Sequence, residues 1–211
     1  MSRTSDEAQD TQRWHGSTAG ERTAERRRQL LDAGFRLLGG EGAAAVTVRG
    51  VTRTSGVSPK YFYDSFPDRE TLLIAVWDEQ YAELRVVVDA AVNNAPGDFS
   101  SRMRAALLAT ADWLVEVPAR GRAMLRETMA DDLLRRHARK RLPELVVETA
   151  VLSDDGGVLL GSLPPERLST SVTALSGAIV NLFLEWTGGG LQISREQLVD
   201  EVLVFTGAVL G

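Results

Sequence analysis

Two short helical segments joined by a glycine turn constrain the fold of this chain more than any other feature. Thr47 is a favourable N-cap, and the helix that it begins is predicted to end at Gly56. Ser58 is a second N-cap, and Pro59 suits the first helical position, where its missing N–H costs nothing. A further helix is therefore predicted from Pro59 to Phe66. Two such helices, packed on a preceding one, are typical of a helix-turn-helix unit.

Helical periodicity also precedes and follows this unit. Apolar residues recur at i, i+3, i+4, i+7 and i+8 between Ala24 and Leu38, which is the stripe of an amphipathic helix. Pro67 ends the helix that begins at Pro59, and Asp68 caps a long helix predicted to run to Asn93. Glycine, proline and aspartate separate the remaining predicted helices, which cover residues 100–115, 118–130, 131–152, 164–186 and 194–210.

The predicted fold class is all-α, with a three-helix head over residues 21–67 on a larger helical body over residues 68–211. Pro143 is expected to split or kink the long helix in the middle of the body. Residues 1–20 are polar and lack apolar spacing, so we expect a disordered arm there. Cysteine is absent, and no uninterrupted apolar run approaches the roughly 20 residues that cross a bilayer. We therefore expect a cytoplasmic protein with no membrane partner.

Charge is distributed unevenly along the chain. Residues 20–66 contain eight basic and five acidic side chains, a local charge of +3, whereas the whole chain carries −5. The other residues therefore carry −8. Such asymmetry indicates a module that binds polyanions, attached to an acidic body. For the run Arg26–Arg28 taken alone, a solvated helix start is an equally good interpretation.

The helix from Pro59 divides into two faces. Phe62 and Phe66 lie four residues apart on one face and can be buried, whereas Lys60 and Tyr61 point elsewhere. Tyr63 has an amphipathic ring that can lie along the domain while its hydroxyl reaches a phosphate. In a helix-turn-helix unit, this is the helix that enters the major groove of DNA. The exposed side chains are thus predicted to form a contact surface.

From Arg26 to about Tyr81 the chain resembles the DNA-binding head of TetR-family (tetracycline-repressor-like) transcriptional regulators. The matching elements share one register: Leu30, Ala33, Leu37, Gly42, Thr47-Val48, Val51, Gly56-Val57-Ser58, Tyr63, Phe66 and Arg69-Glu70-Thr71-Leu72-Leu73. The sequence departs from the family pattern at Gly34 and Gly50, where alanine or another good helix former is usual, and at Thr52. Each interior glycine is expected to cost about 1 kcal/mol relative to alanine.

The resemblance implies that the head binds double-stranded DNA. It assigns contacts with the DNA backbone to Thr47, Tyr63 and Arg69, and we add Arg49 as a further contact. Base reading falls on four residues: Ser58, Pro59, Lys60 and Tyr61. Lys60 supports this role on physical grounds, because its ammonium suits guanine O6 and N7 or a phosphate.

The two C-terminal helices resemble those that pair into a four-helix bundle in dimers of the family. The predicted interface combines small residues with an apolar stripe: Ala174, Gly177, Ala178, Leu198, Val202, Phe205 and Val209. The alternative is that these residues pack inside one chain. A homodimer implies an operator that is an inverted repeat, because the symmetry of the protein is mirrored in its site.

An effector site in the body would be apolar with few polar anchors. Candidate lining residues are Trp77, Tyr81, Met103, Trp113, Met124, Met129, Asn181 and Glu185. For each of them, ordinary core packing is the alternative. We expect a ligand-responsive regulator, a repressor released from its operator by a small, largely apolar effector. The competing hypothesis is a dimeric regulator that is constitutive or controlled by a protein partner.

Catalysis requires a constellation of residues that we do not find. His15 lies in the arm, and His137 lies in the basic run RRHARKR, outside any metal-ligand spacing. The adjacent pairs Asp131-Asp132 and Asp154-Asp155 suit helix caps and loops rather than paired catalytic carboxylates. We therefore expect no enzymatic activity, no cofactor and no metal site.

Overall fold

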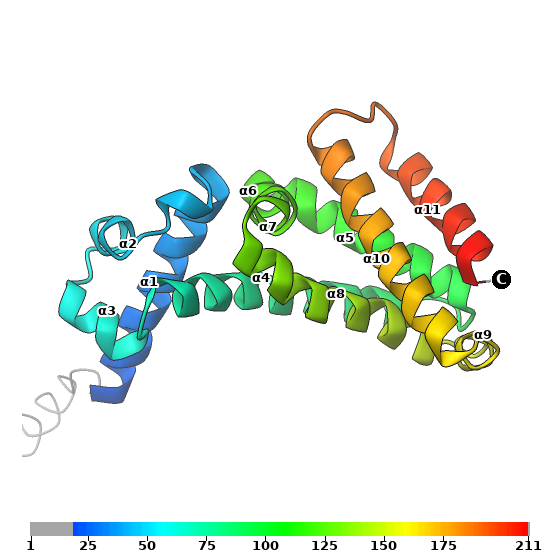
Figure 1. Cartoon of the computed structure of the whole chain (residues 1–211), viewed down its shortest axis with the longest axis horizontal. Coiled ribbons are helices and arrows are strands. Elements are labelled where there is room, and N and C mark those ends of the chain that lie inside the picture. The colour runs from blue at the N-terminus through cyan, green and yellow to red at the C-terminus, as the bar shows by residue number, and fades with distance from the viewer. Residues whose placement is uncertain (1–18, 211) are drawn as a thin grey trace, which may run out of the picture.

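The computed structural model describes residues 19–210, and within that range every regular element is helical (Figure 1). The head consists of α1 (Ala19–Gly40), the single 3-10 turn η1 (Ala43–Ala45), α2 (Val48–Ser55) and α3 (Pro59–Ser65). The body consists of α4 (Arg69–Asn93), α5 (Phe99–Glu116), α6 (Pro118–Gly121), the π-helical η2 (Arg122–Glu127), α7 (Thr128–Ala130), α8 (Asp132–Val151), α9 (Gly156–Gly161), α10 (Pro165–Thr187) and α11 (Arg195–Leu210). The predicted arm lies outside the described residues, except for its last two, which begin α1.

Local capping explains where the helices of the head begin and end. The Thr47 hydroxyl accepts a hydrogen bond from the Gly50 N–H at 2.9 Å, and the Asp68 carboxylate accepts one from the Thr71 N–H at 2.7 Å. The bond from Thr71 lowers the pKa of the Asp68 carboxyl below its ordinary value. Gly56 ends α2 with a φ of 73°, which glycine adopts without strain.

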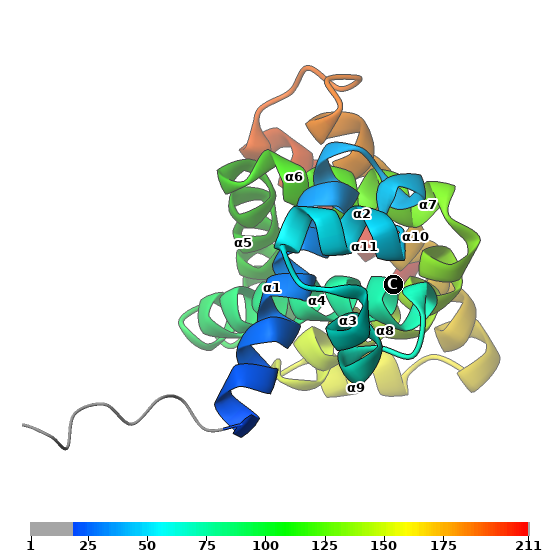
Figure 2. The ribbon, with the colours of Figure 1, turned by 90° about the vertical axis from the view of Figure 1, so that its left-hand side faces the viewer.

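Helix α4 joins the head to the body. It begins beside α1 and α3, runs along the body and packs along α5 and α8 (Figure 1). Figure 2, turned so that the head faces the viewer, places α2 and α3 in front of the body. Any tilt of α4 within the body therefore changes the position of the head.

The middle of the body differs from the sequence predictions in two places. Of the predicted split or kink at Pro143, the split is absent: α8 continues through this residue, and α4, α5 and α10 pack against the helix. Helix α9 covers residues for which no helix was predicted. At its start, a Cβ on Gly156 would lie 2.0 Å from the Ala150 carbonyl oxygen, so only glycine allows this close approach to α8.

The predicted helix over residues 118–130 is present but changes its winding in the middle. The hydroxyl of Thr128 accepts a hydrogen bond from the Trp77 indole N–H at 3.0 Å and donates one to the Ala123 carbonyl at 3.2 Å. Ala123 lies five residues before Thr128, which is the spacing of a π-helix. A buried side-chain contact with α4 thus accompanies the wide turn η2.

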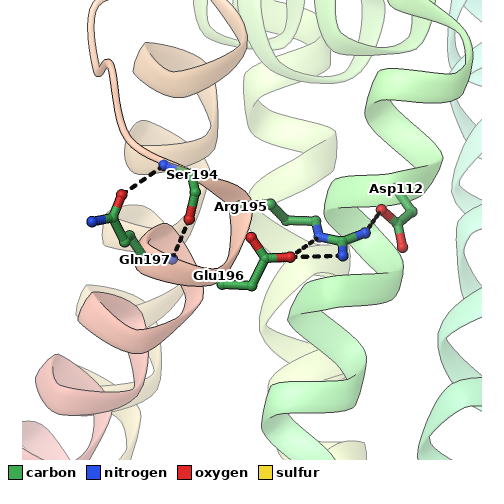
Figure 3. Close-up of polar contacts among 5 residues, drawn as sticks. All are labelled: Asp112, Ser194, Arg195, Glu196 and Gln197. Atoms are coloured by element: carbon green, nitrogen blue, oxygen red, sulfur yellow. Dashed lines mark hydrogen bonds and ion pairs between the residues drawn. The ribbon is translucent and has the colours of Figure 1, made fainter.

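Helix α11 is fastened to α5 by polar contacts near its start (Figure 3). Arg195 forms ion pairs with two carboxylates. Its Nη2 atom lies 2.7 Å from Glu196, and its Nη1 atom contacts Asp112 on α5. Ser194 and Gln197 form a reciprocal capping box, in which each residue's side chain accepts the other's backbone N–H at 3.1 and 2.9 Å. These contacts set the start of α11 against α5.

Helix α10 is long and apolar enough, by length and composition alone, to cross a membrane. Its most apolar 18-residue window has a mean hydropathy of 1.3, and 28% of that window is buried within the chain. The sequence prediction concerned uninterrupted apolar runs, so it did not cover a helix of this kind. The polar residues within α10 interrupt its apolar runs, which concealed it from a search for uninterrupted stretches.

Candidate nucleic-acid interface and internal cavity

Helix α3 presents the two faces that its sequence predicts. Phe62 and Phe66 are buried in the core of the head, with 0% and 1% of their surfaces exposed. Tyr61 and Tyr63 are 38% and 59% exposed, and Lys60 is exposed beside them. A basic side chain and two aromatic rings therefore project from the outer face of a short, well-anchored helix.

Two arginines of α1, Arg26 and Arg27, contact α3. The Arg26 guanidinium lies 4.1 Å above the centre of the Tyr61 ring, and that of Arg27 lies 4.2 Å above the Phe66 ring. Arg27 also donates a hydrogen bond to the Ser65 carbonyl at 3.1 Å, at the end of α3. The basic run thus adds positive charge near α3 and also orients the helix.

A shallow hollow of about 230 Å³ lies beside the start of α2. Thr47, Arg49 and Arg53 contribute to its wall, and both arginine side chains are exposed. Neither arginine forms a salt bridge with any described residue. The Arg49 guanidinium next to the N-terminus of α2 is well suited to an anion, because that end of the helix carries partial positive charge, and Arg53 adds a second positive charge to the hollow.

Arg69 has a different environment from the one that its predicted role implies. Its Nε donates to the Val46 carbonyl at 2.6 Å, and its Nη2 donates to the Ala43 carbonyl at 2.7 Å. The side chain is half-buried. Arg69 therefore fastens the start of α4 to the segment between α1 and α2.

The head is also fastened to the body by two residues of η2. The Glu127 carboxylate accepts a hydrogen bond from the Ala43 N–H at 2.8 Å and forms an ion pair with Arg122 at 3.3 Å. Arg122 in turn donates to the Gly40 carbonyl at 2.6 Å. Sequence reasoning missed this joint, because no local signal links residues that are separated by more than eighty positions.

The body contains an apolar cavity of about 90 Å³ between α4, α5, η2, α8 and α10, and this cavity is partly open to solvent. Three of the predicted pocket residues line it: Met103, Trp113 and Met124. The other lining side chains are mostly leucine, valine, alanine and phenylalanine, with three hydroxyl groups among them. None of the lining side chains is ionisable.

The remaining predicted pocket residues lie elsewhere. Trp77 and Tyr81 are fully buried and stack on each other at 5.2 Å, and the Tyr81 hydroxyl donates to the Arg141 carbonyl at 2.9 Å. Burial raises the pKa of Tyr81 above its ordinary value. Both residues belong to the core, because packing and hydrogen bonds occupy their surfaces. Met129 borders a neighbouring groove, and two others lie exposed on α10: Asn181 and Glu185.

The predicted interface residues of α10 and α11 separate into two groups. Leu198 and Val202 have 0% of their surfaces exposed, so they pack inside this chain and cannot form an exposed interface. Gly177 is exposed, and so are Phe205 at 39% and the unpredicted Val204 at 71%. Ala174 is exposed as well, and two more are partly exposed: Ala178 and Val209.

The two histidines do not form a metal site in the described region. His137 lies 2.6 Å from the Asp78 carboxylate and packs edge-on against Trp77, whereas His15 lies outside the described residues. Within residues 19–210, no three histidine, cysteine, aspartate or glutamate side chains are grouped so that they could hold a metal ion.

Comparison with known proteins identifies the head. The family model for bacterial regulatory proteins of the tetR family matches residues 30–76. Residues 30–76 form a TetR-family domain. The HTH-type transcriptional regulator BetI of Rhizobium meliloti is 42% identical over 60 residues, which are 28% of this chain and 30% of that protein. The sequence match to this curated relative thus spans less than a third of its length.

The TetR-type fold extends through the body. A TetR-family regulator from Rhodococcus sp. superposes with a TM-score of 0.68 at 22% identity, over 89% of this chain and all of that one. One from Syntrophomonas wolfei gives 0.69 at 16% identity, over 89% and 95% of the two chains. The fatty acid degradation regulator FadR of Bacillus halodurans gives 0.63 at 16% identity, over 88% and 95%. At these identities the likeness concerns the fold alone.

Proposed function

We propose that this protein is a dimeric, cytoplasmic DNA-binding regulator of transcription that represses from an inverted-repeat operator and is released by a small, apolar effector. One observation carries the proposal. The TetR-type head exposes Lys60, Tyr61 and Tyr63 beside the free arginines of α2, and the body attached to it contains an apolar cavity.

The charges of the head support contact with DNA. Lys60 is positioned to reach base edges in the major groove, while Arg49 lies where a phosphate would meet the start of α2 and Arg53 borders the same hollow. Ser58 and Pro59 are exposed next to Lys60, so they can approach the same bases. We assign Arg69 to positioning, because both of its donors point to backbone carbonyls.

The exposed face of α10 and α11 supports a dimer. An apolar helix that its own chain leaves largely uncovered needs a partner, because exposed apolar surface is costly in water. A second copy is the simplest partner, since Gly177 and Ala174 allow two α10 helices to approach closely. Such a dimer would carry two α3 helices, which suits an inverted repeat.

Two structural connections support control by an effector in the cavity. Helix α4 borders the cavity at Leu84 and begins at Arg69 in the head. The segment η2 borders the cavity at Met124 and holds the head through Glu127. A ligand that displaces either wall would therefore move the heads relative to each other, and operator half-sites tolerate little change in spacing.

The DNA-binding part is tested by selecting preferred sequences from a random library with the full chain. We expect an inverted repeat. Lys60→Ala should change the preferred bases at defined positions, at a cost of about 1–3 kcal/mol for the original operator. Lys140→Ala removes the same charge from an exposed site on α8, so it should leave the preference unchanged. Equal losses for the two variants on every sequence would contradict the assignment.

The regulatory part is tested by linkage. An effector found by its stabilisation of the protein should bind more weakly when operator is saturating, and operator should bind more weakly with effector by the same factor. If operator leaves the affinity of every such compound unchanged, control by a protein partner or constitutive binding becomes the better hypothesis.

A further inference from the structure

We propose that the internal cavity selects an uncharged, largely apolar molecule that carries a hydrogen-bond acceptor, and that the indole N–H of Trp113 donates to that acceptor. The inference rests on the proposed function, because it specifies the chemistry of the effector that the cavity would hold. Trp113 is thereby assigned as the residue that determines specificity.

The walls of the cavity exclude charge. No lining side chain is ionisable, and most of the lining atoms belong to aliphatic or aromatic groups. A charged ligand would lose its hydration there without gaining a counter-ion, which costs far more than apolar contacts return. The part of the ligand that occupies the cavity must therefore be neutral.

The three hydroxyl groups on the wall are not available as donors to a ligand. Thr110, Thr149 and Ser176 each donate their proton to the backbone carbonyl four residues earlier in the same helix, at 2.8, 2.9 and 2.7 Å. They can still accept a weak hydrogen bond. A ligand acceptor must therefore find its donor elsewhere on the wall.

Trp113 carries that donor. Only 3% of the residue is exposed, its indole N–H is buried, and no described residue accepts a hydrogen bond from it. The indole groups of Trp77 and Trp186 differ in this respect, since each donates at 3.0 Å, to Thr128 and Ile193. A buried donor without a partner is costly, so an acceptor that reaches this N–H when the ligand displaces neighbouring side chains is favoured.

The indole is held in place from outside the cavity. The Arg120 guanidinium lies 4.6 Å above the centre of the Trp113 ring and donates to the Trp113 carbonyl at 3.1 Å. Arg120 is itself paired with Glu116 at 2.9 Å and Glu83 at 3.3 Å. A ring fixed in this way presents its N–H in one direction, which is what selection by a single hydrogen bond requires.

The volume of the cavity limits the size of the ligand. An apolar cavity of about 150 Å³ admits benzene, whereas this one measures about 90 Å³. Met103 and Met124 stand on different walls, and methionine side chains adjust readily to the shape of a ligand. We therefore expect a molecule of about one ring or a short chain, which enters as these two side chains move.

A neighbouring groove contains positive charge, which the cavity lacks. It shares Leu142, Ser176 and Val180 with the cavity and adds the arginines Arg135 and Arg139. Arg135 is occupied by Asp132 and by the Met129 carbonyl at 3.0 Å, whereas Arg139 is exposed. A ligand with an anionic group would use the groove, so a matched anion distinguishes the two locations.

The experiment compares ethylbenzene, acetophenone and benzoate as ligands of the full chain, with tryptophan labelled by ¹⁵N. Ethylbenzene has the same carbon skeleton as acetophenone, but only acetophenone carries an acceptor. We expect acetophenone to bind about five to ten times more tightly than ethylbenzene and to shift the Trp113 indole N–H resonance downfield. Benzoate should bind more weakly than both.

Two variants separate the donor from general packing. Trp113→Phe keeps an aromatic ring but removes the donor, so the preference for acetophenone should disappear. Trp186→Phe makes the same change at an indole outside the cavity that already donates to the Ile193 carbonyl, so the preference should remain. The wild-type resonance of Trp113 decides the matter even if Trp113→Phe does not fold.

Each outcome decides for or against the inference. Equal binding of ethylbenzene and acetophenone, or no binding by any of the three compounds, overturns it. So does tightest binding of benzoate that is lost in Arg139→Ala. If acetophenone binds with the expected preference but leaves operator affinity unchanged, the inference holds and the regulatory part of the proposed function fails.

Discussion

Gly34 lies where α1 and α4 approach closely. Glycine suits this position because a side chain would collide with the neighbouring helix, not because of its own backbone conformation. A Cβ at this position would lie 2.6 Å from the Cγ2 atom of Val76, so α1 and α4 are in close contact here. Gly50 is similar, because a Cβ there would lie 2.7 Å from the Ala45 carbonyl oxygen. The sequence interpretation treated both glycines as a plain cost in helix stability. The structure adds a compensating gain in packing.

We expect Gly34→Ala to destabilise the protein by about 1–2 kcal/mol, because overpacking against the buried Val76 outweighs the better helix propensity of alanine. Gly40→Ala is the matched control. It lies in the last turn of α1, and a Cβ there meets no other atom within 4 Å. Chemical denaturation at one fixed protein concentration measures both variants. A stabilised Gly34→Ala protein would show that α1 and α4 can separate freely.

Among the elements, α4 carries a carboxylate, Glu79, whose unfavourable negative charge should be removed by protonation at low pH. Burial raises the pKa of Glu79 above its ordinary value, and the negative charges of Asp32 and Glu83 raise it further. A raised carboxyl pKa means that the charged form is disfavoured in the folded state. The contribution of protonated Glu79 to the free energy of unfolding is therefore fully present below the ordinary glutamate pKa. It is lost as the pH rises through the raised pKa of the folded state.

Glu79→Gln should therefore unfold at higher denaturant concentration than the wild type at pH 7. The advantage should shrink as the pH falls, and it should vanish below the ordinary range of a glutamate pKa. Denaturation curves of both proteins between pH 4 and 8 measure this difference. An advantage of the same size at both ends of the range would mean that charge is not its cause.

The segment η2, like α4, contacts both the cavity and the head. We expect Glu127→Ala to reduce the coupling between effector and operator, which is typically 1–3 kcal/mol, while it leaves effector affinity nearly unchanged. Loss of the carboxylate leaves the Ala43 N–H without its acceptor. Faster amide hydrogen exchange at residues 43–46 should accompany the change, even without any ligand.

Glu83→Ala is the control for this variant. It also removes a carboxylate from an arginine, Arg120, but it does so on the body and away from the head. If the two variants reduce the coupling equally, the joint between η2 and the head has no special role in transmission.

Helices were predictable from the sequence where their signals are local. Thr47 and Asp68 cap helices as predicted, although the Ser58 side chain makes no capping hydrogen bond. The role of Glu127 was not predictable, because its partner Ala43 is 84 residues away. The stripe that contains Leu198 shows that one face is covered, but it does not show whether the same chain or a second copy covers it.

At the scale of the whole molecule, the dimer is the main untested expectation. We expect Gly177→Arg to produce monomers that bind the operator weakly, because a long charged side chain would occupy the exposed face of α10. Val86→Arg places the same side chain on α4, at a residue that is 70% exposed, and should leave the dimer intact. Light scattering at micromolar concentration measures both. A monomeric wild type would contradict the proposal.

The packing of α5 against α11 affects how the protein can fold during its synthesis on the ribosome. Arg104 and Asp200, which join these helices, are separated by 96 residues. Synthesis proceeds at about 5–20 residues per second. Some seconds therefore pass between the synthesis of α5 and that of α11, which covers it. The head is made earlier and contains its own buried core. A nascent chain can therefore carry a folded head while its body still needs protection from aggregation and proteolysis.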